Sequence, residues 1–161
     1  MAWAKSTTHT EVGTVDDVTT DSYTSSKFQQ VMSHIIGITN VGNYWKMRMS
    51  GNTGSVYASR YKWNGGTEYT STGETSMLVN STTAVADNNL VVDYVCAIAG
   101  EEKLAIGNIV DNVASGAGTA PNRKEAACKW VNTSNQFDIV GSYTASGTYN
   151  ANSNLSVLGT D

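Results

Sequence analysis

The stretch RMSGNTGSVYASRYKWNGG, residues 48–66, places a glycine-bracketed polar loop between two segments that alternate apolar and polar side chains. Residues 44–49 before the loop and residues 56–63 after it both repeat with a period of two, which is the period of a pleated strand. A glycine loop that cradles phosphate instead links a strand to a helix and usually has a lysine nearby. The stretch therefore predicts a hairpin connection in which Asn and Gly of SGNTG take positive φ angles.

The same period of two continues along most of the chain after Phe28. Turn-rich clusters such as NGGTEYTSTGE, TAVADNN, AGEE, ASGAGTAPNR and TASGTYNAN separate the patterned segments, and this spacing is typical of a sandwich or barrel. One segment, KFQQVMSHIIG, also fits helical spacing, but its neighbours favour a strand. We therefore predict an all-β fold, an antiparallel β-sandwich of about eight to nine strands. The predicted strands are residues 28–38, 44–49, 56–63, 75–79, 90–98, 104–109, 125–131, 137–143 and 154–158.

The first 23 residues are Thr-rich and only weakly patterned, and they predict an extended polar N-terminal arm with one short strand around residues 11–15. Residues 1–161 are expected to form a single domain that includes this arm. The arm cannot build a core of its own, yet it carries Trp3, Val12, Val15 and Val18. We hypothesise that the arm crosses to an adjoining subunit or to the capsid by strand addition, and that these four residues form the contact, with Trp3 filling a pocket.

The charge of the chain argues against some partners. Charged residues make up 15% of the sequence, and 14 acidic against 10 basic residues give a net charge of −4 without a long run of one sign. Neither nucleic acid nor an anionic membrane is therefore expected as a partner. No segment is apolar enough to span a membrane, and MAWAKSTTHTEVG has no apolar signal region, so synthesis in a cytoplasm is expected.

The groups that usually carry catalysis or bind metals are sparse. His9 and His34 have no partner at metal-ligand spacing, and no G-x-S-x-G motif occurs. Asp16, Asp17 and Asp21 could offer oxygen ligands to Ca²⁺, but their spacing is not that of an EF-hand, and a solvated acidic turn is favoured. We predict no catalytic residue, no metal site and no cofactor. Cys96 and Cys128 lie in apolar runs, where buried free thiols are favoured over a disulfide.

Three aromatic residues, Tyr57, Tyr61 and Trp63, share one face of one predicted strand. Core packing explains this spacing and is the default for aromatic residues in a strand. An outward-facing row could instead stack on sugar rings. A carbohydrate-binding domain with these three residues as its site, and a host glycan as its ligand, is therefore kept as an alternative.

Several segments in order resemble small virion proteins of tailed phages and archaeal viruses. The matching residues are 49–57 in the glycine loop, 116–123 (GAGTAPNR), 129–134 (KWVNTS) and 152–159 (NSNLSVLG). The sequence departs from the pattern of those proteins at Ser50, Asn52, Val56 and Cys128. The resemblance implies a jelly-roll-like β-sandwich on a virus particle and implies no catalytic residues.

This resemblance leads us to expect a non-enzymatic virion structural protein, made in the host cytoplasm and placed at the virion surface. We expect a capsid decoration or cement protein that binds the outer shell as an oligomer, best matched by a homotrimer at a three-fold site. Its partners would be further copies of the chain and the major capsid protein or another virion protein. A tail, fibre or filament subunit is the first alternative, and the carbohydrate-binding sandwich for host attachment is the second.

Overall fold

Strands make up the regular structure of the chain in the computed structural model, which describes residues 2–11, 13, 16–36, 44–81, 88–112, 116–144 and 147–161. No helix occurs within these ranges. The strands in chain order are β1 (Ala4–Thr10), β2 (Asp17–Thr19), β3 (Phe28–Ile36), β4 (Tyr44–Met49), β5 (Tyr57–Trp63), β6 (Glu68–Glu74), β7 (Met77–Ser81), β8 (Asn88–Cys96), β9 (Lys103–Asn112), β10 (Asn122–Trp130), β11 (Val140–Thr144) and β12 (Asn154–Thr160).

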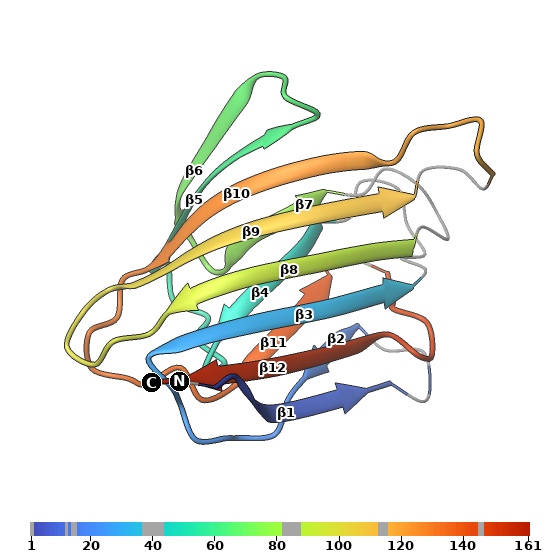
Figure 1. Ribbon diagram of the computed structural model, residues 1–161. Coiled ribbons are helices and arrows are strands. Elements are labelled where there is room, and N and C mark those ends of the chain that lie inside the picture. Colours follow the sequence, from blue (N-terminus) through green and yellow to red (C-terminus); the bar gives the residue numbers. More distant parts are fainter. Residues whose placement is uncertain are drawn as a thin grey trace.

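The strands form two antiparallel sheets that lie face to face, with the smaller sheet behind the larger one in Figure 1. The larger sheet has eight strands in the order β1-β12-β3-β8-β9-β10-β5-β6, and the smaller has four in the order β2-β11-β4-β7. The prediction of an all-β antiparallel sandwich is confirmed, although 12 strands are described instead of about eight to nine. The jelly-roll connectivity stays a prediction.

Each of the nine predicted segments overlaps a strand of the structure. The ambiguous segment KFQQVMSHIIG forms β3, in which Val31, Ser33 and Ile35 are buried while the residues between them are half-buried. This alternation selects a strand over a helix, because β12 and β8 flank β3 on both sides and satisfy its backbone hydrogen bonds. Residues 37–38, at the end of the predicted strand, lie outside the described part of the chain.

The loop SGNTG is a turn, but the prediction that it closes a hairpin is wrong. β4 belongs to the smaller sheet and β5 to the larger one, so the loop carries the chain from one sheet to the other. Positive φ angles occur at Ser50 (49°) and Gly51 (63°), and not at Asn52 as predicted. The Tyr57 hydroxyl donates to the backbone oxygen of Asn52 at 3.1 Å, which ties the crossing to the start of β5. The alternation on each side of the loop predicts two strands, but it does not show whether these strands pair with each other.

Three strands were missed because they are polar edge strands. Residues 68–74 were predicted as part of a turn cluster, yet they form β6, which pairs with β5. The N-terminal arm supplies β1, which pairs with β12, and β2, which pairs with β11. β1 and β6 are exposed over most of their length, so they have no apolar alternation to reveal them. β2 has only three residues, of which Val18 is buried, too few to show an alternation. The predicted strand around residues 11–15 falls mostly outside the described residues.

The core lies between the two sheets and includes the largest buried side chains of each. Trp130 of β10 and Tyr57 of β5 stack with their ring centroids 6.2 Å apart and their planes 13° apart. Phe137 and Tyr149 are also fully buried, and the Tyr149 hydroxyl lies 3.0 Å from Ser142 Oγ of β11 in the smaller sheet. Buried residues on both sheets contribute to the same core, so each sheet stabilises the other. The buried apolar residues of the smaller sheet include Val18, Met47, Met49, Met77 and Val140.

A buried lysine holds the turn between β8 and β9, which the cluster AGEE was predicted to form. Lys103 has no exposed surface, and its ammonium group donates to the backbone oxygens of Ile98 (3.0 Å), Glu101 (2.6 Å) and Asn132 (3.1 Å). Three carbonyl oxygens thus surround one positive charge, which offsets the cost of burying it. Lys103 joins the turn to the segment after β10 and so fixes the end of the larger sheet.

Candidate interaction surface

Six large apolar side chains are exposed on the outer face of the larger sheet, the face turned away from the smaller sheet. Their exposed fractions range from 44% to 59%, and Ile106 and Leu104 of β9 are the most exposed. Half-buried Met32, Val92 and Cys96 lie on the same face. We call the six residues the apolar strip: Phe28, Leu90, Tyr94, Leu104, Ile106 and Val110.

Strand register makes the apolar strip continuous. Tyr94 pairs with Ile106 and Leu90 pairs with Val110 across β8 and β9. At one end of the strip, Cys96 lies between Phe28 of β3 and Leu104 of β9. Side chains of directly opposite residues on one face are close enough to contact one another. The strip therefore runs from Cys96 and Leu104 to Leu90 and Val110, interrupted on β9 by exposed Asn108. β8 and β9 lie side by side at the centre of the larger sheet in Figure 1.

β9 and β8 carry apolar side chains on both of their faces. In β9, Leu104, Ile106 and Val110 point outward, while Ala105 and Ile109 are buried together with Lys103 and Asp111. In β8, Leu90 and Tyr94 are exposed, while Val91 and Val95 are buried together with Asn89 and Asp93. A sheet with apolar residues on both faces is typical of one that is covered on both faces. The outer face therefore has the composition of a buried surface.

Trp3 lies at one end of the apolar strip. It lines an apolar depression of about 410 Å³ together with Phe28, Tyr94, Leu104 and Ile106, and 46% of its own surface is exposed. The sequence predicted that Trp3 would contact a neighbouring subunit. The structure places it on the outer face of its own chain, where it extends the strip by one aromatic side chain.

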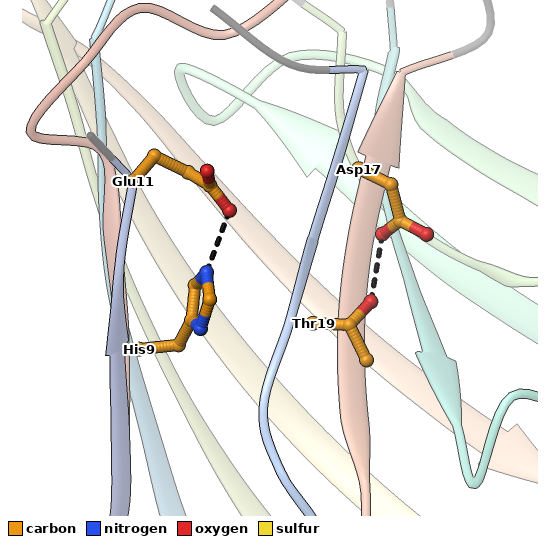
Figure 2. A network of polar contacts seen from close by, with 4 residues as sticks. All are labelled: His9, Glu11, Asp17 and Thr19. Carbon is orange, nitrogen blue, oxygen red and sulfur yellow. Dashed lines mark hydrogen bonds and ion pairs between the residues drawn. The ribbon is translucent and has the colours of Figure 1, made fainter. Parts of the chain in front are cut away.

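The remaining residues of the predicted arm interface are placed differently. Val18 has no exposed surface and belongs to the core of its own chain, paired through β2 with β11. Val12 and Val15 lie outside the described residues. The polar residues near them pair locally, as Figure 2 shows: His9 Nε2 lies 2.7 Å from Glu11 Oε1, and Thr19 Oγ1 donates to Asp17 Oδ1 at 2.9 Å.

Exposed ion pairs border the apolar strip on its β10 side. Lys129 Nζ lies 3.3 Å from Glu102 Oε2, and Arg123 Nε lies 3.6 Å from Glu125 Oε1. Arg60 of β5 pairs with Glu68 of β6. Exposed pairs of this kind add little to stability. In these three pairs along the border, each positive charge lies close to a negative charge.

The three aromatic residues of the carbohydrate alternative do not form one exposed row. Tyr57 is 1% exposed and packs in the core. The Lys124 ammonium lies 5.2 Å from the ring centre of Tyr61 and 4.8 Å from that of Trp63, in cation–π contacts. Sequence reasoning missed Tyr69 of β6, which stacks on Tyr61 with 5.4 Å between ring centroids and is 52% exposed. Burial lowers the pKa of Lys124 to about 8, partly opposed by Asp111.

Ionisable groups inside the sandwich have shifted pKa values. Burial raises the pKa of Asp93 to about 7, and its Oδ2 atom has no hydrogen-bond partner among the residues that the structure describes. Burial also raises the pKa of Cys128 to about 12, with a small opposing effect of the Ser59 hydrogen bond. Both cysteines are free, as predicted, and register places Cys96 on the outer face while Cys128 is buried.

Within the described ranges, no group of three or more His, Cys, Asp or Glu side chains is arranged to hold a metal ion. The same ranges contain no helix of the length and hydropathy needed to cross a membrane. Comparison with known proteins finds no matching family model, no matching curated protein and no matching solved structure. The outer face of the larger sheet is therefore the surface on which we base a functional proposal.

Proposed function

We propose that this protein is a non-enzymatic virion structural protein, a capsid decoration or cement protein that binds the outer shell as an oligomer. The observation that supports an assembly role is the apolar strip on the outer face of the larger sheet. Ile106 and Leu104 are 59% and 55% exposed at the centre of a sheet whose buried face carries Lys103, Asp93 and Asp111. Contiguous exposed apolar surface of this kind marks sites of protein–protein contact.

The edges of the larger sheet are less suited to assembly than its face. The two edge strands are β1 and β6, and each has an irregular register with its neighbour: between Lys5 and Thr7 in β1, and opposite Tyr57 and Ala58 in β6. Bulges and lysines on edge strands hinder pairing with another sheet. The chain therefore favours contacts through side chains of the outer face over extension of its sheet.

The resemblance to small virion proteins supports the location on a virus particle. On a shell, each subunit would make the same contact many times, so weak individual contacts would add up to tight binding through avidity. A homotrimer suits a three-fold position of such a shell. A tail, fibre or filament subunit would use the same contact chemistry but repeat along an axis, and electron microscopy of the native assembly separates the two.

The experiment that tests this function is antibody labelling of intact virus particles. Antibodies raised against the recombinant protein should bind the outside of capsids in a virus preparation that carries this sequence, as seen by immunogold electron microscopy. Antibodies against an internal virion protein serve as the control and should label only disrupted particles. Label on tails instead of capsids supports the tail alternative, and no label on intact or disrupted particles contradicts a virion role.

A further inference from the structure

We propose that the apolar strip is covered by a second copy of this chain, which makes the outer face of the larger sheet the interface between subunits. This inference rests on the proposed function in taking the outer face as an assembly surface. It goes further by naming the occupant of that face.

The outer face is large enough for a stable pair of subunits. β3, β8 and β10 have nine residues each and β9 has ten. At a rise of about 3.3 Å per residue the strands are ~30 Å long, and five strands from β12 to β10 are ~24 Å wide. The flat area is then about 700 Å², close to the ~800 Å² that each partner of a standard interface buries. A neighbouring sheet of equal length would cover the whole strip.

The border of the strip favours a copy of the same chain over a strongly charged partner. The bases Arg60, Arg123 and Lys129 each have an acid beside them on the same chain. These three pairs therefore offer no net charge to a partner of opposite sign. They also do not repel an identical border, because positive and negative groups alternate along it. Such an apolar centre with a polar rim is the usual anatomy of a homomeric interface.

The centre of the strip has both a protrusion and a depression. Leu104 and Ile106 are the most exposed apolar side chains, and they stand beside the depression of about 410 Å³ that Trp3 also lines. Two copies facing each other would each present these side chains to the depression of the other copy; this two-fold contact joins pairs of chains, so a trimer at a three-fold site would need a second kind of contact. Aromatic and aliphatic anchors in apolar pockets are the contacts that contribute most to binding. A substitution at Ile106 should therefore weaken the contact between the two copies.

The test measures the mass of the purified full-length chain by light scattering over a range of concentrations. The wild type should have at least twice the 17.1 kDa mass of the single chain. Ile106→Lys would bury an unpaired charge at the interface and should weaken self-association roughly tenfold or more, with an unchanged circular dichroism spectrum. Tyr69→Lys is the matched control, because Tyr69 is 52% exposed but stacks on Tyr61 away from the strip. The control should assemble as the wild type does.

Several outcomes would overturn the inference. A monomeric wild type at all concentrations, or Ile106→Lys and wild type with equal masses, means that a second copy does not cover the strip. If the monomeric wild type still binds virus particles, a shell protein is the occupant, and the proposed function survives without this inference. If the wild type assembles through Ile106 while antibodies label no particle, the inference stands and the virion role fails.

Discussion

Asp93 and Gly107 lie directly opposite each other on β8 and β9, and the Asp93 carboxylate occupies the space that a side chain at position 107 would need. A Cβ atom built on Gly107 would collide with Asp93 Oδ1. Asp93 is 2% exposed, so its carboxylate cannot swing into solvent without opening the sheet. The Asp93 carboxylate can therefore occupy its buried position only because residue 107 is a glycine.

Gly107→Ala should destabilise the fold for this reason. The new methyl group would overpack the inner face and displace the carboxylate, at a cost of about 2 kcal/mol in the free energy of unfolding. Gly118→Ala is the control, because a Cβ atom at Gly118 would meet nothing within 4 Å. Chemical denaturation of both variants measures the difference. Equal stability of the two variants would show that Asp93 does not fill this space in solution.

The buried acid also predicts how stability depends on pH. Burial raises the pKa of Asp93 from 3.8 to about 7 in the folded chain, so folding favours the protonated acid. This contribution is complete below the pKa of the unfolded chain and is lost as the pH rises through about 7. Asp93→Asn cannot titrate and serves as the reference. Relative to it, the free energy of unfolding of the wild type should fall by roughly 3 kcal/mol between about pH 5 and about pH 8. Urea denaturation at both pH values measures this, and a constant difference between the two proteins would contradict it.

Lys103→Met should remove the charge that holds three backbone carbonyls. The methionine keeps most of the volume, but the oxygens of Ile98, Glu101 and Asn132 lose a charged donor inside the protein, and unfolding should become easier by roughly 3–5 kcal/mol. Lys129→Met breaks only the exposed pair with Glu102 and should change stability by less than about 1 kcal/mol. Thermal melting monitored by circular dichroism compares the two. Similar melting temperatures would mean that the three carbonyls find other donors.

The two cysteines should differ in reactivity with a thiol reagent. Cys128 is buried and its pKa is raised to about 12, so its reactive thiolate is rare at neutral pH. Cys96 lines the depression on the outer face and should react first in the folded chain. Mass spectrometry of the labelled peptides identifies the modified residue. Cys96 should react faster in Ile106→Lys than in the assembled wild type, and equal rates in the two proteins would argue against coverage of the strip.

The sequence predicted the fold well where strands alternate clearly, as in β3, and poorly where polar edge strands carry no such signal, as in β1 and β6. It could not place SGNTG between sheets, because alternation in β4 and β5 does not say which strands pair. The site escaped prediction for a related reason: the pattern of β9 shows that Leu104 and Lys103 point in opposite directions, but not which one points outward. A lysine among apolar residues normally marks the solvent side. Here Lys103 is buried, because it donates to the carbonyls of Ile98 and Glu101 in the adjoining turn and of Asn132 after β10.

Photo-cross-linking from position 106 identifies directly what lies against the outer face of the larger sheet. Chains with a photoreactive phenylalanine derivative in place of Ile106 would be mixed with isotope-labelled chains and irradiated, and the joined peptides identified by mass spectrometry. If a second copy covers the face, links should form between two different chains and end in the peptides that contain β3, β8 or β9. Links confined to one chain, or ending in the smaller sheet of another, would contradict this arrangement.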